Sequence, residues 1–191
     1  MKIIKVDDAL RDMNRVELAK AIREGAIIIY PTDTVYGIGC NALKKESVEK
    51  IAKVKAREPG KPFSVIAPSK AWITENARIT ADNAQFVNNL LPGPYTVILR
   101  AKKPIPLVTS KDGKLGVRIP KNEFCDFIRS QGSPFVTTSV NLSTTGPIAS
   151  LREIPAPIAE VTDYAIDAGE IRGLSSRVFD ISGKDMEIVR W

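Results

Sequence analysis

Residues 26–39 read Ala-Ile-Ile-Ile-Tyr-Pro-Thr-Asp-Thr-Val-Tyr-Gly-Ile-Gly, and this stretch decides how the chain is laid out. Residues 26–30 are apolar and stop at Pro31, which is the length and composition of a buried strand. The polar residues 32–34 then lie at the exit of that strand, where a ligand could reach them. The alternative for these residues is a turn lined by hydroxyl groups.

The glycines of this stretch raise the question of a dinucleotide-binding loop. Gly37, Gly39 and Ala42 match the pattern G-x-G-x-x-A. In such folds the first glycine follows the strand directly, and a helix opens at the end of the pattern. Here Pro31 and five further residues intervene, and residues 44–46 separate Ala42 from the next helical pattern. We therefore reject a dinucleotide-binding loop.

The rest of the chain alternates between strand and helix patterns, which predicts an α/β or α+β domain. Residues 143–160 are rich in Pro and Thr, and we expect a long loop or lid there that can include a short helix. We expect helices at residues 14–24, 46–56, 81–91 and 122–130, and strands at residues 26–30, 63–67, 95–101, 115–119, 135–140, 164–168, 178–181 and 187–189. Thr80 is expected to cap the helix at 81–91.

The first of these helices has signals at both ends. Asn14 and Glu17 suit the N-cap and N3 positions of a capping box. Val16, Ala19 and Ile22 are predicted to share the buried face, and Gly25 is a typical residue at a helix C-terminus.

The composition describes an ordinary globular protein. The chain has 191 residues, of which 43% are hydrophobic and 26% are charged, so we expect a single domain covering residues 1–191. No apolar run approaches the ~20 residues of a membrane span, and the N-terminal residues lack the apolar core of a signal peptide. These features favour a cytoplasmic location without membrane contact, in which Cys40 and Cys125 are reduced thiols.

The chain contains no histidine, and its net charge is +6 with a pI near 9.3. The absence of histidine excludes Ser-His-Asp and Cys-His catalysis and zinc sites with histidine ligands. A basic chain attracts the phosphates of nucleotides or nucleic acids, although the same charge can serve solubility alone.

A basic segment follows the second predicted helix. Lys53, Lys55, Arg57 and Lys61 lie within nine residues. Cations at a helix C-terminus are favourable by roughly 0.3–1 kcal/mol each, which accounts for Lys53 and Lys55. This helix-end effect accounts poorly for Lys61, because the helix is expected to have ended before Pro59 and Gly60. A clamp for a polyphosphate would account for all four cations.

Two further segments carry polar groups at strand positions. Residues 137–146 read Thr-Thr-Ser-Val-Asn-Leu-Ser-Thr-Thr-Gly, a run that can bind phosphate oxygens and ribose hydroxyls or can form a Thr-rich surface turn. Arg118 lies inside an apolar strand, where burial is costly unless an anion pairs with it. An edge strand with Arg118 facing solvent is the alternative.

Taken together, these segments resemble the YrdC/Sua5 family of threonylcarbamoyl-adenylate synthases, over residues 25–190. The resemblance rests on seven blocks in order: Pro-Thr-Asp-Thr-Val-Tyr-Gly at 31–37, Lys-x-Arg at 55–57 with Lys-Pro-Phe at 61–63, Leu-Pro-Gly-Pro-Tyr-Thr-Val-Ile-Leu at 91–99, Val-Arg-Ile-Pro at 117–120, Thr-Ser-Val-Asn-Leu-Ser at 138–143, Ser-Arg-Val-Phe-Asp at 176–180 and Ile-Val-Arg at 188–190.

The resemblance implies a twisted mixed β-sheet surrounded by helices, with a basic concave face that has also been interpreted as a surface for tRNA or double-stranded RNA. It implies an enzyme that condenses L-threonine, bicarbonate or CO2, and ATP with Mg²⁺ into threonylcarbamoyl-AMP. A transferase complex then uses this product to form N6-threonylcarbamoyladenosine (t6A) at position 37 of tRNAs. The implied site residues are Thr34, Arg118 and Thr137 for threonine; Arg57, Lys61, Ser139, Asn141 and Arg190 for ATP; and Arg57, Lys55 and Lys61 for catalysis.

The sequence departs from the family pattern at a few positions. Ile66 stands where some members have a histidine near the threonine, Lys114 replaces a hydroxyl, and Arg177 replaces a threonine. The turn at 143–147 is one residue longer than usual.

Three other functions compete with the synthase. They are a non-catalytic RNA-binding or translation-associated module, a carbamoyl-adenylating domain acting on another acceptor, and a nucleotide hydrolase.

Overall fold

The computed structural model describes residues 1–57, 62–142 and 145–190, and the fold they form is a mixed sheet with helices on both sides. The helices are α1 (Val6–Ala9), α2 (Asp12–Glu24), α3 (Lys45–Val54), α4 (Lys70–Asn76), α5 (Ala81–Leu90), α6 (Glu123–Arg129) and α7 (Ala156–Val161), with a 3-10 turn η1 at Leu151–Glu153. The strands are β1 (Lys2–Lys5), β2 (Ile28–Tyr30), β3 (Gly37–Gly39), β4 (Ser64–Ile66), β5 (Ala77–Arg78), β6 (Tyr95–Ala101), β7 (Lys114–Arg118), β8 (Phe135–Ser139), β9 (Tyr164–Asp167), β10 (Arg177–Asp180) and β11 (Glu187–Arg190).

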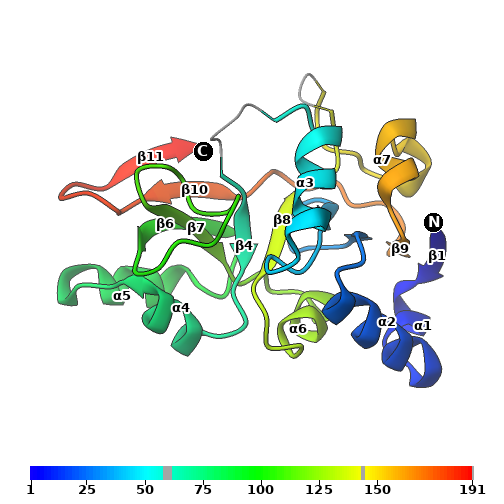
Figure 1. Ribbon diagram of the computed structural model, residues 1–191, viewed down its shortest axis with the longest axis horizontal. Coiled ribbons are helices and arrows are strands. Elements are labelled where there is room, and N and C mark those ends of the chain that lie inside the picture. The colour runs from blue at the N-terminus through cyan, green and yellow to red at the C-terminus, as the bar shows by residue number, and fades with distance from the viewer. Residues whose placement is uncertain (58–61, 143–144, 191) are drawn as a thin grey trace.

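The strands follow the order β1-β9-β2-β3-β8-β4-β7-β6-β10-β11, with β5 added beside β6. The pairs β1/β9, β2/β9, β4/β7 and β6/β10 are parallel, and the other pairs are antiparallel. Figure 1 shows β4 and β8 near the middle of the molecule, with α3 close to them. The predicted fold class, a mixed sheet surrounded by helices, is confirmed.

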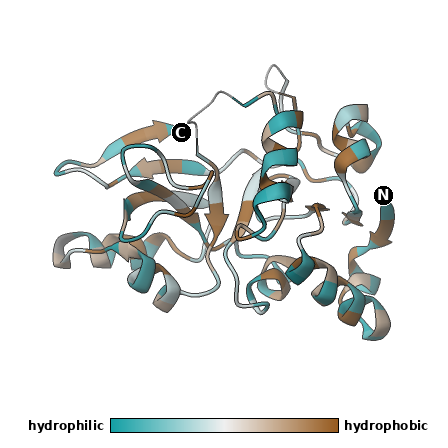
Figure 2. Cartoon of the chain, in the orientation of Figure 1, coloured by the Kyte–Doolittle hydropathy of each residue, from teal (hydrophilic) through white to brown (hydrophobic). Residues whose placement is uncertain are grey.

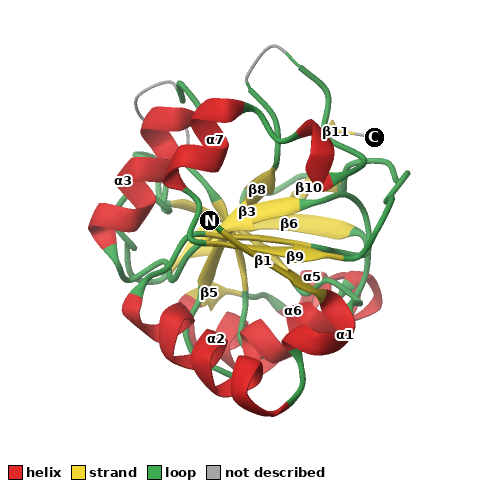
Figure 3. Ribbon diagram, turned by 90° about the vertical axis from the view of Figure 1, so that its right-hand side faces the viewer, coloured by secondary structure: helices red, strands yellow, loops and turns green. Residues whose placement is uncertain are grey.

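Helices cover both faces of the sheet, as Figure 3 shows: α3 and α7 lie on one side, and α1, α2, α5 and α6 lie on the other. Strand β2 shows how one segment supplies both cores. Ile28 and Tyr30 belong to the apolar cluster packed against α2 and α6, whereas Ile29 belongs to the cluster on the α3 side. This alternation follows from the two-residue period of a strand. Figure 2 shows apolar strands inside and polar helix faces outside.

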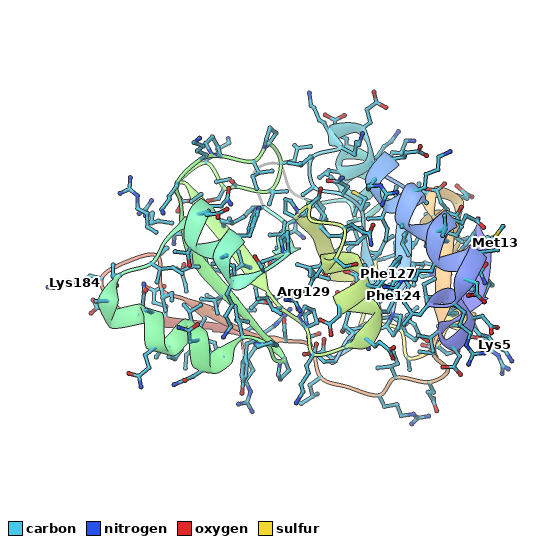
Figure 4. All side chains as sticks on the ribbon, turned by 90° about the horizontal axis from the view of Figure 1, so that it is seen from below. Lys5, Met13, Phe124, Phe127, Arg129 and Lys184 are labelled. Carbon is cyan, nitrogen blue, oxygen red and sulfur yellow. The ribbon has the colours of Figure 1, made fainter. Side chains whose placement is uncertain are left out.

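The α6 side of the core is aromatic. Phe124 and Phe127 lie between α6 and α2 in Figure 4, and both side chains are buried. Asn122 begins α6, because its side-chain oxygen accepts from the backbone N–H groups of Phe124 and Cys125 at 3.0 and 3.2 Å. Such a cap satisfies N–H groups that have no partner inside the helix.

The predicted helix boundaries are correct where the capping chemistry is local. Thr80 begins α5 with a complete capping box to Asn83. Gly25 ends α2 with φ of 99°, a backbone conformation that favours glycine. The short helix expected near the end of residues 143–160 is α7, which ends at Val161, and residues 143 and 144 of this segment lie outside the described residues.

The predicted start of the first helix is wrong. Helix α2 begins at Asp12, and its N-cap residue makes no side-chain cap. Asn14 donates instead to the carbonyl of Asp8 at 3.1 Å, and Glu17 pairs with Lys2 at 2.8 Å. Val16 was expected on the buried face but is 70% exposed.

Strand β3 was not predicted, although its residues were singled out. Gly37 and Gly39 are the first and last residues of this strand, which pairs antiparallel with β2 and β8. A Cβ at Gly39 would lie 1.8 Å from the carbonyl oxygen of Val136, so only glycine allows this close approach. The two glycines thus lie within a strand and not in a turn between a strand and a helix.

Cys40 and Cys125 are both free thiols and both buried. Burial raises the pKa of Cys40 to about 12. No helix within the described ranges is long and apolar enough to cross a membrane.

Candidate functional site

A pocket of about 450 Å³ opens on the described part of the surface, where the segments after β2, α3 and β8 meet β7 and the C-terminal strands. Its lining is mostly polar. The lining residues are Thr32, Thr34, Val35, Tyr36, Gly37, Lys55, Arg57, Ser64, Thr96, Arg118, Thr137, Thr138, Ser139, Asn141, Ser175, Ser176, Val178 and Arg190.

Every predicted site residue that the structure describes lies in this lining: Thr34, Lys55, Arg57, Arg118, Thr137, Ser139, Asn141 and Arg190. Lys61, predicted as an ATP-binding and catalytic residue, lies outside the described residues.

Arg118 reaches the pocket from the inside of the sheet. Strand β7 lies between β4 and β6, and Arg118 is only 7% exposed, so the alternative of a solvent-facing edge arginine is wrong. Its Nη2 donates to Asp33 Oδ1 at 2.8 Å and to Thr34 Oγ1 at 3.3 Å. Its Nε is buried and has no hydrogen-bond partner among the described residues. A buried N–H left unpaired costs about 1–3 kcal/mol, and a bound anion could offset this.

Hydroxyl groups surround this arginine. The loop after β2 folds back so that Thr32 Oγ1 lies 2.9 Å from Thr34 Oγ1 and donates to the carbonyl of Val35 at 2.7 Å. From β8, Thr137 Oγ1 accepts from the phenol of Tyr30 at 2.8 Å. Burial raises the pKa of Tyr30, which therefore keeps its proton and donates. The hydroxyls are thus held in fixed positions beside Arg118.

Lys55 lines the pocket from the end of α3. Its Nζ donates to the carbonyls of Ser139 and Asn141 at 2.9 and 2.5 Å and to Asn141 Oδ1 at 2.7 Å. Ser139 Oγ donates to the same Asn141 Oδ1 at 2.6 Å. This network ties the end of α3 to the exit of β8 and fixes the side chain of Asn141.

The two remaining arginines are held by the backbone. Arg57 donates to the carbonyl of Pro62, and its guanidinium lies over the ring of Phe63 at 4.3 Å from the centroid. Arg190 donates to the carbonyl of Ser176 through Nε at 2.9 Å and Nη2 at 2.7 Å. Both are therefore oriented before any ligand binds.

Positive charge in this pocket is costly. Burial, followed by the charge of Arg57, lowers the pKa of Lys55 to about 8. Burial lowers the pKa of Arg57, and burial together with Arg118 lowers the pKa of Arg190. Each lowered pKa means that the protonated, positively charged side chain is destabilised in the pocket. An anionic ligand would stabilise it.

The segment between β9 and β10 crosses over the loop after β2. Tyr36 anchors it by donating its hydroxyl to the carbonyl of Gly169 at 2.8 Å and accepting from the N–H of Ala168 at 2.9 Å. Further along, Gly173 lies against Thr34, and a Cβ there would be 1.8 Å from the Thr34 carbonyl oxygen. This crossing brings Ser175 and Ser176 to the pocket.

Several functional neighbours were not singled out in the sequence. Asp33 was named only as one of the polar residues 32–34 and was given no role, and nothing in the sequence shows that it pairs with Arg118. Ser176 Oγ, 2.9 Å from Thr96 Oγ1, also accepts from Arg190 at 3.0 Å. The family block at 176–180 was the only sequence feature that included Ser176.

Three positions that depart from the family pattern are not among the lining residues, although Ile66 is paired with Arg118 across β4 and β7. The fourth departure, the turn at 143–147, lies partly outside the described residues. Ile66 is fully buried in the core on the α6 side. Lys114 pairs with Asp180 at 2.9 Å, and Arg177 is exposed. In the described ranges no group of three or more His, Cys, Asp or Glu residues could hold a metal ion.

Comparisons with known proteins place the sequence and the fold of the chain among relatives. The family model Sua5_yciO_yrdC, described as "Telomere recombination", matches residues 20–191. A Methanocaldococcus jannaschii protein provisionally named threonylcarbamoyl-AMP synthase is 35% identical over 173 residues, covering 90% of this chain and 82% of the relative. Escherichia coli YciO, whose function is uncharacterised, is 27% identical, with 91% and 86% covered.

The solved structures include Pyrococcus abyssi Sua5 complexed with L-threonine. It superposes with a TM-score of 0.86 at 27% identity, and all of this chain is covered. The chain spans 57% of the length of that protein.

Proposed function

The chain belongs to the Sua5/YciO/YrdC family, and on that premise we propose that it is an L-threonylcarbamoyladenylate synthase. In this reaction L-threonine, bicarbonate or CO2, and ATP give threonylcarbamoyl-AMP and pyrophosphate. The observation that carries the proposal is the pocket, because it joins a buried arginine, whose Nε lacks a partner within the described ranges, to three further cations and a set of hydroxyls.

We assign the threonine half of the site to Arg118, Thr34 and Thr137. The guanidinium of Arg118 can hold a carboxylate through parallel hydrogen bonds. Asp33 orients it from behind, and the two threonine hydroxyls beside it can bind the polar groups of the amino acid. The structure of Pyrococcus abyssi Sua5, a relative complexed with L-threonine, supports threonine as the ligand.

We assign the nucleotide half to Arg57, Arg190, Ser139 and Asn141, together with Lys61. The arginines supply charge for the phosphates, and Ser139 and Asn141 supply a hydroxyl and an amide for phosphate or ribose oxygens. Lys55 positions this half, since its ammonium holds the exit of β8 through three oxygen atoms. It also adds positive charge where the phosphates would lie.

The chemistry suits a site without histidine. The threonine carbamate is already an anion, so its oxygen can attack the α-phosphorus of ATP without a general base, and pyrophosphate leaves. The main requirement is stabilisation of the charge that develops on the phosphate oxygens, which fixed cations provide. Lys55, Arg57 and Arg190 are cations of this kind.

Mg²⁺ would arrive with the nucleotide as part of the substrate. The described lining offers hydroxyl and amide oxygens but no carboxylate, and magnesium commonly keeps several waters and binds through substrate phosphates. These donors fit a hydrated ion carried by ATP, and the metal would neutralise phosphate charge there.

The proposed product is a mixed anhydride for transfer to an acceptor. We propose that a threonylcarbamoyl transferase complex consumes it to form t6A at position 37 of tRNAs in the cytoplasm. The net charge of +6 supports contact with tRNA or double-stranded RNA.

Pyrophosphate release tests the proposal. Purified protein with Mg²⁺ and ATP should release pyrophosphate only when both threonine and bicarbonate are added. Equal release without threonine would indicate a nucleotide hydrolase. No release under any condition would leave the RNA-binding module as the better account.

A further inference from the structure

The backbone at the end of α3 carries a left-handed residue that is not glycine. Ala56 has φ of 43°, and it stands between Lys55 and Arg57. This conformation is unfavourable for an L-residue, because its Cβ comes too close to a carbonyl oxygen. Glycine adopts it without that cost. The side chain of Ala56 is exposed, so packing of its methyl group does not explain the strain.

Backbone hydrogen bonds identify the turn around Ala56. The N–H of Ala56 donates to the carbonyl of Lys53 at 3.0 Å, and the N–H of Arg57 donates to the carbonyl of Ala52 at 3.1 Å. These two bonds, together with the left-handed residue, form a Schellman motif, in which glycine is the usual residue. Here alanine occupies that position, and the turn ends α3 within one residue.

The turn decides where two cations point. In a continuous helix, residues two positions apart lie on different faces, so Lys55 and Arg57 could not line the same pocket. Both of them nevertheless line the pocket described above. Lys55 caps the C-terminus of α3, and the chain takes a new direction at Ala56 before it reaches Arg57. The left-handed conformation therefore brings the two side chains together.

Contacts on both sides of the turn hold the strained conformation. Lys55 Nζ donates to two backbone carbonyls at the exit of β8, and the guanidinium of Arg57 lies over the ring of Phe63. Burial and then the charge of Arg57 lower the pKa of Lys55, so the two cations are kept close at a cost. Backbone strain persists where the surroundings over-determine it, and it is common at functional sites.

We propose that Ala56 is a positioning residue of the nucleotide half, and that its left-handed backbone sets the spacing of Lys55 and Arg57 to which the polyphosphate binds. The inference rests on the proposed function for the assignment of these cations to ATP. The backbone conformation carries the role, and the methyl group does not. Residues that tolerate a left-handed conformation should preserve ATP binding, whereas a β-branched residue should weaken it.

Three substitutions separate backbone conformation from side-chain size. Ala56→Gly and Ala56→Asn both tolerate the left-handed conformation, and the exposed position leaves room for asparagine. We expect both variants to bind ATP at least as tightly as the wild type. Ala56→Val should raise Kd for ATP about tenfold or more, which is the order expected when a hydrogen bond to a charged group is lost.

The matched control is a second strained residue outside the pocket lining. Leu107 has φ of 64°, is 41% exposed and is not among the described residues that line the pocket. Leu107→Val creates the same conflict between a β-branched side chain and a positive φ. It should lower the melting temperature as Ala56→Val does, but it should leave Kd for ATP and KM for threonine unchanged.

Two measurements on the full chain test the proposal. Calorimetric titration with ATP and Mg²⁺, without threonine, gives Kd for ATP. Steady-state pyrophosphate release, with ATP and threonine varied separately, gives the two Michaelis constants. We expect Ala56→Val to raise KM for ATP about tenfold or more and to leave KM for threonine unchanged, because Arg118 lies on β7 and not on this turn. A merely structural residue would lower the melting temperature without this split.

Several results would overturn the positioning role. Wild-type ATP binding by Ala56→Val, or equal weakening by Leu107→Val, would show that the turn does not place the cations. Loss of ATP binding in Ala56→Gly or Ala56→Asn would show that the methyl group matters and the conformation does not. These last two variants keep the test decisive even where Ala56→Val fails to fold.

The proposed function is tested separately by the same proteins. If Ala56→Val weakens ATP binding as expected but the wild type forms no threonylcarbamoyl-AMP, the positioning role stands and the synthase function fails. If the wild type forms the product and Ala56→Val keeps the wild-type Kd and KM for ATP, the synthase function stands and the positioning role is wrong.

Discussion

Substitution of Arg118 by lysine tests the threonine half of the site most sharply. The change keeps the positive charge, and lysine can still pair with Asp33, so we expect the fold to persist. It removes the planar fork, of which Nη2 is engaged by Asp33 at 2.8 Å and by Thr34 at 3.3 Å while Nε has no partner in the described part of the chain. Lysine cannot orient one group toward Asp33 and present parallel donors to a substrate carboxylate.

The magnitude follows from the lost hydrogen bond. A hydrogen bond to a charged group contributes about 1.5–3 kcal/mol, and about 1.4 kcal/mol corresponds to tenfold in binding. The threonine α-carboxylate does not react, so its binding is the same in the ground state and the transition state. We therefore expect KM for threonine to rise about tenfold or more, with little change in kcat or in KM for ATP.

The assay is steady-state pyrophosphate release with threonine and ATP varied separately, and Arg100→Lys is the control. If KM for ATP rises and KM for threonine stays constant, Arg118 belongs to the nucleotide half and our assignment of the two halves is reversed. If neither constant changes, the arginine has no role in binding.

The remaining predictions concern the nucleotide half and the crossing segment. Arg57→Ala should lower kcat/KM for ATP by the equivalent of about 2–4 kcal/mol while the circular dichroism spectrum stays native; normal turnover would contradict the clamp. Because the pKa of Lys55 is lowered from 10.5 to about 8, the unfolded chain binds more protons between these values. The free energy of unfolding of the wild type relative to Lys55→Met should therefore rise as the pH increases from about 8 to 10.5 in urea denaturation; a flat or falling difference would mean that the lysine pKa is not lowered. Gly173→Ala should lower the melting temperature and raise KM for threonine, because its Cβ would lie 1.8 Å from the Thr34 carbonyl oxygen; Gly183→Ala, with its nearest atom at 3.8 Å, is the control and should behave like the wild type.

The parts of the fold that local chemistry determines could be predicted from the sequence. Strand β6 and helix α5 match their expected ranges closely, since a short apolar run after Pro94 and a Thr80 cap act over a few neighbours. Strand β3 was missed because its two glycines have low strand propensity. It forms because β2 and β8 both pair with it.

In the site, too, some features could be predicted from the local sequence, whereas others depend on how the strands pair. An arginine in an apolar strand predicted a buried cation that needs an anion, and Arg118 is buried. Its pairing with Asp33 spans 85 residues, and the bonds from Lys55 to Asn141 span 86. Such contacts depend on the sheet order, which the sequence pattern does not specify. The role of Asp33 therefore became visible only in the folded chain.

The central claim is that this pocket makes threonylcarbamoyl-AMP, and product analysis with isotope-labelled bicarbonate tests it directly. Protein, Mg²⁺, ATP and threonine are incubated with ¹³C-bicarbonate, and the adenylate is analysed by mass spectrometry. We predict a mixed anhydride of AMP and N-carboxythreonine that carries one ¹³C atom and disappears when threonine is omitted. AMP or ADP as the only nucleotide product, formed at the same rate without threonine, would contradict the account.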